Sequence, residues 1–181
     1  MFLDNIPVHN LDETDFFVVE RIENCAPLNF RGSHRHNFYE LLFFTETGTD
    51  ESHSIDFIEY SLQSNQLYLL RPGQVHTMKL KGQMGFLFAI NPAYFERLCL
   101  HIESYADHTF PSMLLLPEKE TSAIRQIARL IYTEHEGLHR KSLLNSYMHA
   151  LITHLLLLYT DTRVDQDIRV SKVLSLIDKH Y

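Results

Sequence analysis

Three histidines and one glutamate stand at spacings that suit a shared binding site: His34, His36, Glu40 and His76. Because side chains alternate between the two faces of a β-strand, His34, His36 and Glu40 share one face of an extended segment. His76 follows a Pro-Gly turn, at the start of another candidate strand. Such a set can bind a divalent metal, orient a small polar ligand, or satisfy its own hydrogen bonds at the mouth of a barrel.

Short β-rich runs separated by turn residues surround these four positions. They span residues 16–22, 38–45, 53–60, 66–71, 74–80 and 84–90, and their spacing favours a small barrel or sandwich. The run 38–45 is almost continuously apolar, as expected for a strand buried on both faces, so Glu40 within it needs a polar partner. The dipeptide Ser52-His53 carries no recognisable motif, and we assign it no function.

The second half of the chain changes to helical periodicity. A short helix is expected after Pro92, and a longer one from Pro117 to the polar residues around Gly137. The next segment, residues 140–160, carries apolar residues spaced four, three, four and three apart, as in a coiled-coil seam: Leu144, Met148, Leu151, Leu155 and Leu158. Such a stripe can form a dimer contact, which the family resemblance described below favours. The alternative is a helix that is buried within its own domain.

Composition and charge limit the classes of protein to which this chain can belong. The chain has 181 residues, enough for one core, and a formal net charge of −7, which gives these residues no electrostatic footprint for nucleic acid. The two cysteines, Cys25 and Cys99, form no closely spaced pair, and no apolar run approaches membrane-spanning length. A reducing cytoplasm is therefore the expected compartment.

Two motifs together resemble a known family. The segment Gly32-Ser-His-Arg-His-Asn-Phe-Tyr-Glu40 and the segment Arg71-Pro-Gly-Gln-Val-His76 resemble the two signature motifs of the cupin barrel. The stretches HRHNFYELLFFTETG, NQLYLLRPGQVH and NPAYFE, in this order, resemble the N-terminal sensor domain of AraC/XylS-type bacterial transcription regulators. The resemblance covers roughly residues 12–181.

The resemblance implies a fold that is mainly β with α: a cupin-type double-stranded β-helix, or jelly-roll barrel, followed by an antiparallel helical pair. It divides the chain into an N-terminal arm (1–14), an effector-binding barrel (15–116), a helical dimerisation region (117–160), a linker (161–168) and a truncated first helix of a helix-turn-helix domain (169–181). DNA would then be bound only through a C-terminal domain that follows this helix.

The resemblance also implies a function, which is sensing of a small-molecule effector by a homodimeric regulator without enzymatic activity. The expected effector-binding residues are His34, His36, Phe38, Glu40, Leu42, Arg71, His76 and Met78. Arg71, with its planar guanidinium, can bind an effector carboxylate. No cofactor is certain, although His34, His36, Glu40 and His76 are a ligand set that a divalent transition metal accepts.

The alternative from another class is a metal-dependent cupin enzyme, such as a dioxygenase or isomerase. Two features argue against it: the expected linker and amphipathic helix over residues 161–181, which an isolated enzyme would not need, and the irregular match to the cupin motifs. Gly48 lies one residue further from Glu40 than that pattern prefers, and Leu80 stands where cupins often carry asparagine.

Overall fold

The computed structural model describes residues 6–12, 15–25, 32–48, 50–79, 81–100, 102 and 110–159. The strands are β1 (Val8–His9), β2 (Phe17–Arg21), β3 (Arg35–His36), β4 (Tyr39–Glu46), β5 (Ser52–Ile55), β6 (Ile58–Ser61), β7 (Gln66–Leu70), β8 (His76–Met78), β9 (Met84–Ile90) and β10 (Met113–Leu115). The helices are a 3-10 turn (Ile22–Asn24), α1 (Pro92–Cys99), α2 (Glu118–Glu136) and a helix over residues 141–159.

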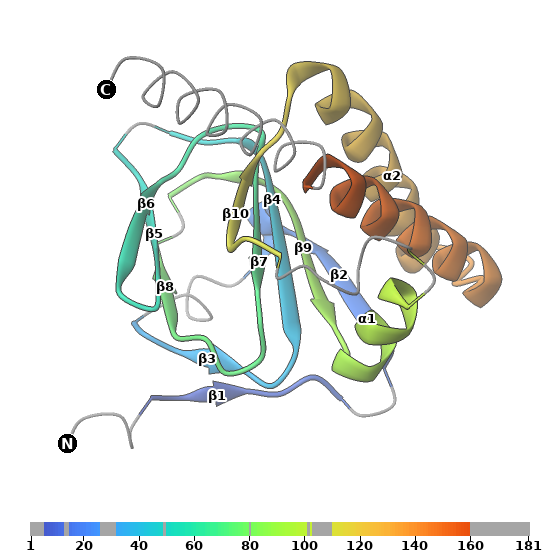
Figure 1. Ribbon diagram of the computed structural model, residues 1–181, viewed down its shortest axis with the longest axis horizontal. Coiled ribbons are helices and arrows are strands. Elements are labelled where there is room, and N and C mark those ends of the chain that lie inside the picture. Colours follow the sequence, from blue (N-terminus) through green and yellow to red (C-terminus); the bar gives the residue numbers. More distant parts are fainter. Residues whose placement is uncertain are drawn as a thin grey trace, which may run out of the picture.

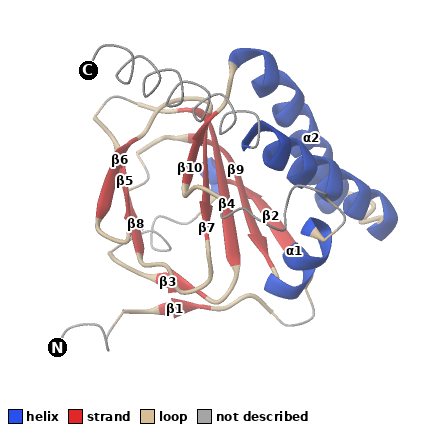
Figure 2. Ribbon diagram, in the orientation of Figure 1, coloured by secondary structure: helices blue, strands red, loops and turns tan. Residues whose placement is uncertain are grey.

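Two sheets enclose the interior of a barrel, and the helices cover the outside of one of them (Figure 1). The larger sheet has the strand order β10-β7-β4-β9-β2 and the smaller one the order β6-β5-β8, while β1 pairs in parallel with β3. Figure 2 shows the strands gathered on one side of the molecule and the helices on the other. The expected fold class, a cupin-like β barrel followed by helices, is confirmed.

The central strand β4 separates two apolar cores. Leu41 and Phe43 point to the helix-side core, whereas Leu42 and Phe44 point into the barrel, and all four are at most 1% exposed. This alternation is the strand period of two, applied to a strand that is covered on both faces. The same alternation turns Glu40 into the barrel, because Glu40 shares the parity of Leu42.

The helical pair is antiparallel and belongs to the helix-side core. His154 of the second helix lies 3.8 Å from Glu120, near the start of α2. The predicted dimer stripe packs inside the chain itself: Leu144, Met148, Leu151 and Leu155 are 0–4% exposed, and Leu158 packs against the same cluster. These side chains therefore form no free surface for a second subunit, because they are buried in one cluster with residues of the larger sheet, α1 and α2. The stripe instead belongs to a helix that is buried within its own domain, which was the alternative to a dimer contact.

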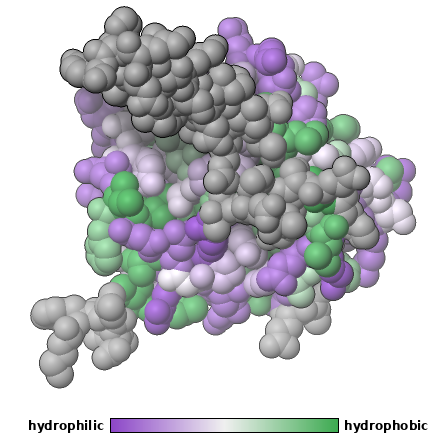
Figure 3. All heavy atoms as spheres, in the orientation of Figure 1, coloured by the Kyte–Doolittle hydropathy of each residue, from purple (hydrophilic) through white to green (hydrophobic). Residues whose placement is uncertain are grey.

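Other elements depart from the sequence prediction more locally. The run 53–60 is two strands, with Asp56 and Phe57 at the turn in left-handed conformations, at φ 48° and 69°. Phe57 and Ile58 of this hairpin are 83% and 59% exposed. Figure 3 shows hydrophobic atoms, in green, at the left of the view, where Figure 1 draws the smaller sheet. The short strands β1 and β10 lack a recognisable hydrophobic period and were not predicted, whereas β3 falls within the extended segment expected around His34 and His36.

The expected linker (161–168) and truncated helix (169–181) lie outside the described residues. Among the described helices, none has the length and apolar character needed to cross a lipid bilayer.

Candidate functional site

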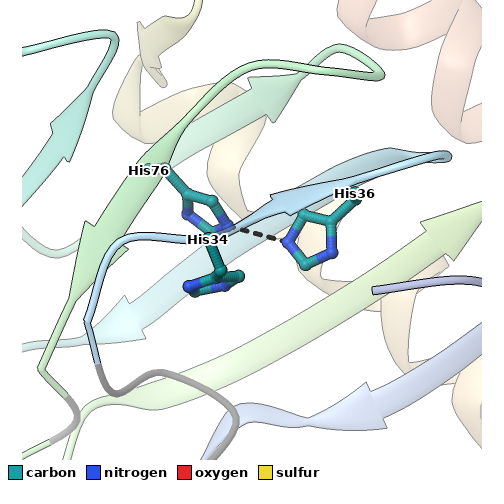
Figure 4. A group of neighbouring side chains, drawn as sticks. All are labelled: His34, His36 and His76. Carbon is teal, nitrogen blue, oxygen red and sulfur yellow. Dashed lines mark hydrogen bonds between the residues drawn. The ribbon is translucent and has the colours of Figure 1, made fainter. Parts of the chain in front are cut away.

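The four predicted polar side chains meet inside one end of the barrel. His34, His36, Glu40 and His76 are 2%, 5%, 3% and 1% exposed. One ring nitrogen from each of the three histidines lies within 4.8 Å of the others, and Figure 4 shows the three rings turned toward one another. Their predicted convergence is confirmed, while their role in binding a metal or an effector stays a prediction.

Backbone pairing between distant segments brings these side chains together. The His34 amide donates to the His76 carbonyl at 3.0 Å, and the His76 amide donates back to the His34 carbonyl at 2.9 Å. The amide of Gly73, in the Pro-Gly turn, donates to the His36 carbonyl at 2.8 Å. Two such anchors fix the register between β3 and β8, so both histidine segments face the same interior.

A fifth buried side chain, His53, joins this group. His53 is 0% exposed, and its Nε2 lies 2.9 Å from His76 Nδ1, while His76 Nε2 lies 2.8 Å from His36 Nε2. Sequence reasoning missed His53, although strand alternation was a usable signal, since His53 and Ile55 share the inward face of β5. The contact from His53 fixes one nitrogen of His76 and leaves the other directed at His36.

Several buried polar atoms in this group have no hydrogen-bond partner. Glu40 Oε2, His36 Nδ1 and His53 Nδ1 make no hydrogen bond. The two carboxylate oxygens of Glu40 lie 3.5 Å from His36 Nε2 and 3.6 Å from His76 Nε2, beyond good hydrogen-bond length. An unpaired buried polar group costs about 1–3 kcal/mol, so the site can gain free energy by binding a ligand that supplies partners.

Burial keeps part of this histidine group uncharged. Removal from water lowers the pKa of His53 to about 3, with the nearby His34 adding to the effect. Burial also lowers the pKa values of His34 and His76 below that of an ordinary imidazole, against the raising effect of the Gly32 carbonyl on His34. At neutral pH these rings are therefore neutral and offer nitrogen lone pairs.

The group fits the chemistry of a divalent transition metal. Neutral imidazoles and a carboxylate are the ligands that zinc, iron, nickel or manganese accepts. His34 Nδ1 lies 3.1 Å from the Gly32 carbonyl, and His76 Nδ1 lies against His53. Bonds of this kind, from the ring nitrogen that does not face the metal, orient histidine ligands in metalloproteins.

A pocket of about 260 Å³ adjoins the histidines. One wall of the pocket is formed by the larger sheet, at inward positions of β2, β4 and β9. Residues 9–11 of the arm form part of the opposite lining. The lining residues are His9, Asn10, Leu11, Val18, Glu20, Cys25, His34, His36, Phe38, Glu40, Leu87 and Ala89. The contribution of the arm was not predicted: the His9 ring centre lies 4.9 Å from that of His34 and 5.5 Å from that of His36.

The remaining predicted effector residues lie elsewhere. Leu42 and Met78 are 0% and 1% exposed in the interior of the barrel, where they pack beneath the site and do not line the pocket. The guanidinium of Arg71 donates to the carbonyl of Phe110 and lies outside the pocket lining. The expected contact between Arg71 and an effector carboxylate is therefore not supported, because this side chain is engaged by the segment that leads to β10.

Comparisons with known proteins identify the family of this chain and structures with a similar fold. A sequence model of the AraC-like ligand binding domain matches residues 16–152. An apo variant of ToxT from Vibrio cholerae has a similar structure, with a TM-score of 0.50 and 11% identity, over 81% of this chain and 58% of that one. Wild-type ToxT with a bound unsaturated fatty acid gives a TM-score of 0.41 and 11% identity, over 77% of this chain and 54% of that one.

The similarity to ToxT concerns the fold alone, and this chain spans little more than half of that protein's length. No curated protein matched the sequence. The family match covers most of the chain, including the barrel and most of the helical pair. The chain belongs to the family of AraC-like ligand-binding domains.

Proposed function

We propose that this chain senses a small-molecule effector inside its barrel and controls a DNA-binding region of an AraC-type transcription regulator. The observation that carries the proposal is the pocket beside the histidines, where Glu40 and His36 keep buried polar atoms without partners. A pocket with apolar walls and a few convergent polar groups is the usual form of a small-molecule site. Membership of a family of ligand-binding domains supports the same conclusion.

The arm is the element best placed to respond to an effector. Two backbone bonds hold it on β3: the Arg35 amide donates to the Pro7 carbonyl at 3.0 Å, and the Asn37 amide donates to the His9 carbonyl at 3.1 Å. A ligand in the pocket would touch both the arm and the histidines beneath it. Its binding free energy would therefore depend on the position of the arm, and by linkage it would shift that position.

The effect of a bound effector would reach the DNA-binding domain through the residues that follow the helical pair. We propose that residues 161–168 link the helical pair to a helix-turn-helix domain that begins at 169–181, and that DNA is bound through that domain. The net charge of −7 fits this division, because phosphate binding needs a positive surface. The cytoplasm, where the DNA lies, is the proposed compartment.

A homodimer remains part of the proposal, since two subunits on two half-sites bind an operator tightly. The buried stripe cannot supply its contact. Exposed apolar side chains on the helical pair are better candidates, and Leu130 and Leu157 are 47% and 51% exposed. Sedimentation of Leu130→Asp and Leu157→Asp variants would test these two positions separately.

Metal binding is a second candidate, favoured by the three neutral imidazoles and the Glu40 carboxylate. The nitrogen atoms of these rings and the carboxylate oxygens would be the ligands that hold the ion. Metal analysis of the purified protein tests this candidate: near-stoichiometric iron, manganese or nickel that is lost in His36→Ala would favour the metal-dependent enzyme over the sensor.

Native mass spectrometry tests the proposed effector site. The purified chain is expected to carry a small molecule that a Leu87→Trp variant loses, because Leu87 lines the pocket and the indole would fill it. Leu115→Trp is the matched control, on a residue of β10 that is 54% exposed. Equal retention of the molecule by both variants would contradict binding in this pocket.

A further inference from the structure

The charge of the pocket selects the class of effector. Two carboxylates line it, Glu20 and Glu40, and among the described residues no lysine or arginine side chain does. The positively charged guanidinium of Arg71 is bound to the Phe110 carbonyl outside the pocket. The fixed charge of the described lining is therefore negative.

The two carboxylates stand at different depths. Glu40 is 3% exposed at the base, beside the histidines, whereas Glu20 is exposed at the mouth. Glu40 pairs with Ala89, which pairs with Val18, and Glu20 lies two residues further along β2. Two strand spacings across the sheet and two residues along β2 therefore separate the two acidic positions, roughly 12 Å in all. A ligand that binds in the pocket and is shorter than this separation therefore lies in the electric field of both carboxylates.

The Glu40 carboxylate at the base of the pocket is not held by a good hydrogen bond: His36 Nε2 and His76 Nε2 lie 3.5 and 3.6 Å from it. Glu40 Oε2 is buried without a partner. The thiol of Cys25, another lining residue, donates instead to Glu20 Oε2 at 3.4 Å. Burial and the nearby Glu20 and Glu40 carboxylates together raise the pKa of the Cys25 thiol to about 12, and the part from the carboxylates reflects the negative field at this point.

We propose that the effector is a small organic cation: a primary ammonium group that binds at Glu40, on a short apolar body that packs against Val18, Leu87 and Ala89. An ammonium group brings three N–H donors and a positive charge, which match an unpaired buried carboxylate. A carboxylate ligand would add a third negative charge to a site of low effective dielectric constant. The inference rests on the proposed function, because it takes this pocket as the effector site.

Three probes that share one skeleton test the charge selection: hexylamine, hexanol and hexanoate. Binding is measured by calorimetry and by the shift in Tm at pH 8, where an ordinary imidazole is neutral and an alkylamine is protonated, with a chelator present to exclude metals. Hexylamine is expected to bind at least about tenfold more tightly than hexanol, and hexanoate to bind most weakly.

Variants then assign the selection to Glu40. Glu40→Gln keeps the shape of the side chain and is expected to remove the preference for hexylamine over hexanol. Glu20→Gln, at the solvated mouth, is expected to reduce the preference by less, about threefold, because water screens that charge. Glu46→Gln, on the same strand β4 but not among the lining residues, is the matched control and should leave it unchanged.

Hexanoate binding as tightly as hexylamine would overturn the inference, and so would a preference that survives in Glu40→Gln or the failure of all three probes to bind. None of these results would contradict the proposed function, which the loss of a co-purified molecule in Leu87→Trp tests separately.

Discussion

The two faces of β4 show two different uses of a buried interior. On the helix side, Leu41 and Phe43 join an apolar core with α1, α2 and the 141–159 helix. Inside the barrel, the same strand contributes Leu42 and Phe44, but also Glu40, beside a group of buried histidines. One face of the strand is covered by packing alone, and the other combines packing with polar groups.

The difference lies in where the buried polar groups stand. Arg125 Nε and Thr153 Oγ1 on the helices also lack hydrogen-bond partners, but Glu40, unlike them, lines the pocket beside the histidines. On α2, the buried Thr121 donates to the Pro117 carbonyl at 3.1 Å, and Glu134 is bound by the Arg140 guanidinium at 2.6 Å. In the barrel, Glu40 Oε2 has no such partner. Buried polar atoms are normally paired, so an exception that borders a pocket indicates a ligand site and not a structural contact. The comparison implies that stability depends mainly on the helix side and ligand binding on the barrel side.

The largest effect is expected from a charge placed in the helix-side core. Leu151 is 1% exposed, so Leu151→Asp buries an unpaired carboxylate and should destabilise the fold by more than about 4 kcal/mol, or unfold it. Circular dichroism with urea titration measures the loss. Leu157→Asp, on the same helix but 51% exposed, is the control and should stay folded. A folded, monomeric Leu151→Asp protein would instead restore this stripe as a dimer contact.

A smaller but still large effect is expected from acid, and it arises in the barrel. Because burial lowers the pKa of His53 to about 3, the unfolded chain binds a proton here that the folded chain does not, from about pH 6.5 downward. The stabilising contribution is therefore complete above pH 6.5 and falls by about 1.4 kcal/mol per pH unit as the pH decreases toward the folded-state pKa. The pKa values of His34 and His76, also lowered by burial, act in the same direction.

Urea titrations between pH 4 and pH 8 would measure this dependence. His53→Phe should make the slope below pH 6.5 shallower by about 1.4 kcal/mol per pH unit, since one titrating group is lost. An identical slope in the variant and the wild-type protein would show that His53 takes up no proton on unfolding.

The smallest effect is expected at the arm. His9→Ala removes the ring that lies on His34 and His36 and should cost about 0.5–1.5 kcal/mol. Hydrogen exchange should become faster at the Arg35 and Asn37 amides, which bind the arm, and stay slow in the 141–159 helix. Val8→Ala is the neighbouring control, at a residue that is 46% exposed. Unchanged exchange at Arg35 and Asn37 would mean that the His9 ring does not hold the arm.

The features predicted correctly from the sequence are those that strand alternation, helical periodicity and motif spacing determine. The long strands, the helices and the convergence of His34, His36, Glu40 and His76 follow from local patterns that extend over several residues. Strand alternation could have placed His53 on the inward face of β5, but the pairing of β5 with β8, which brings it to His76, has no local signal. His9 was missed because it stands alone in its segment and reaches the site through the pairing of β1 with β3.

The helical stripe shows a different limit of sequence reasoning. A four-three spacing reports that one face of a helix is apolar, but it does not say which surface covers that face. The stripe from Leu144 to Leu155 fits a dimer seam and an internal core alike, and in the structure it is buried in the core formed by the larger sheet, α1 and α2 of the same chain. Arg71 illustrates the same limit, since its partner, the Phe110 carbonyl, has no sequence signature.

The unfolding free energy of a Glu40→Leu variant tests most directly whether the polar group in the barrel serves binding. If Glu40 is there for a ligand, leucine of similar size should leave stability unchanged within about 1 kcal/mol, or raise it, because an unpaired buried carboxylate is removed while His36 and His76 keep their mutual contact. A loss of about 3–5 kcal/mol, the usual result of breaking a buried ion pair, would contradict the account and make Glu40 a structural residue.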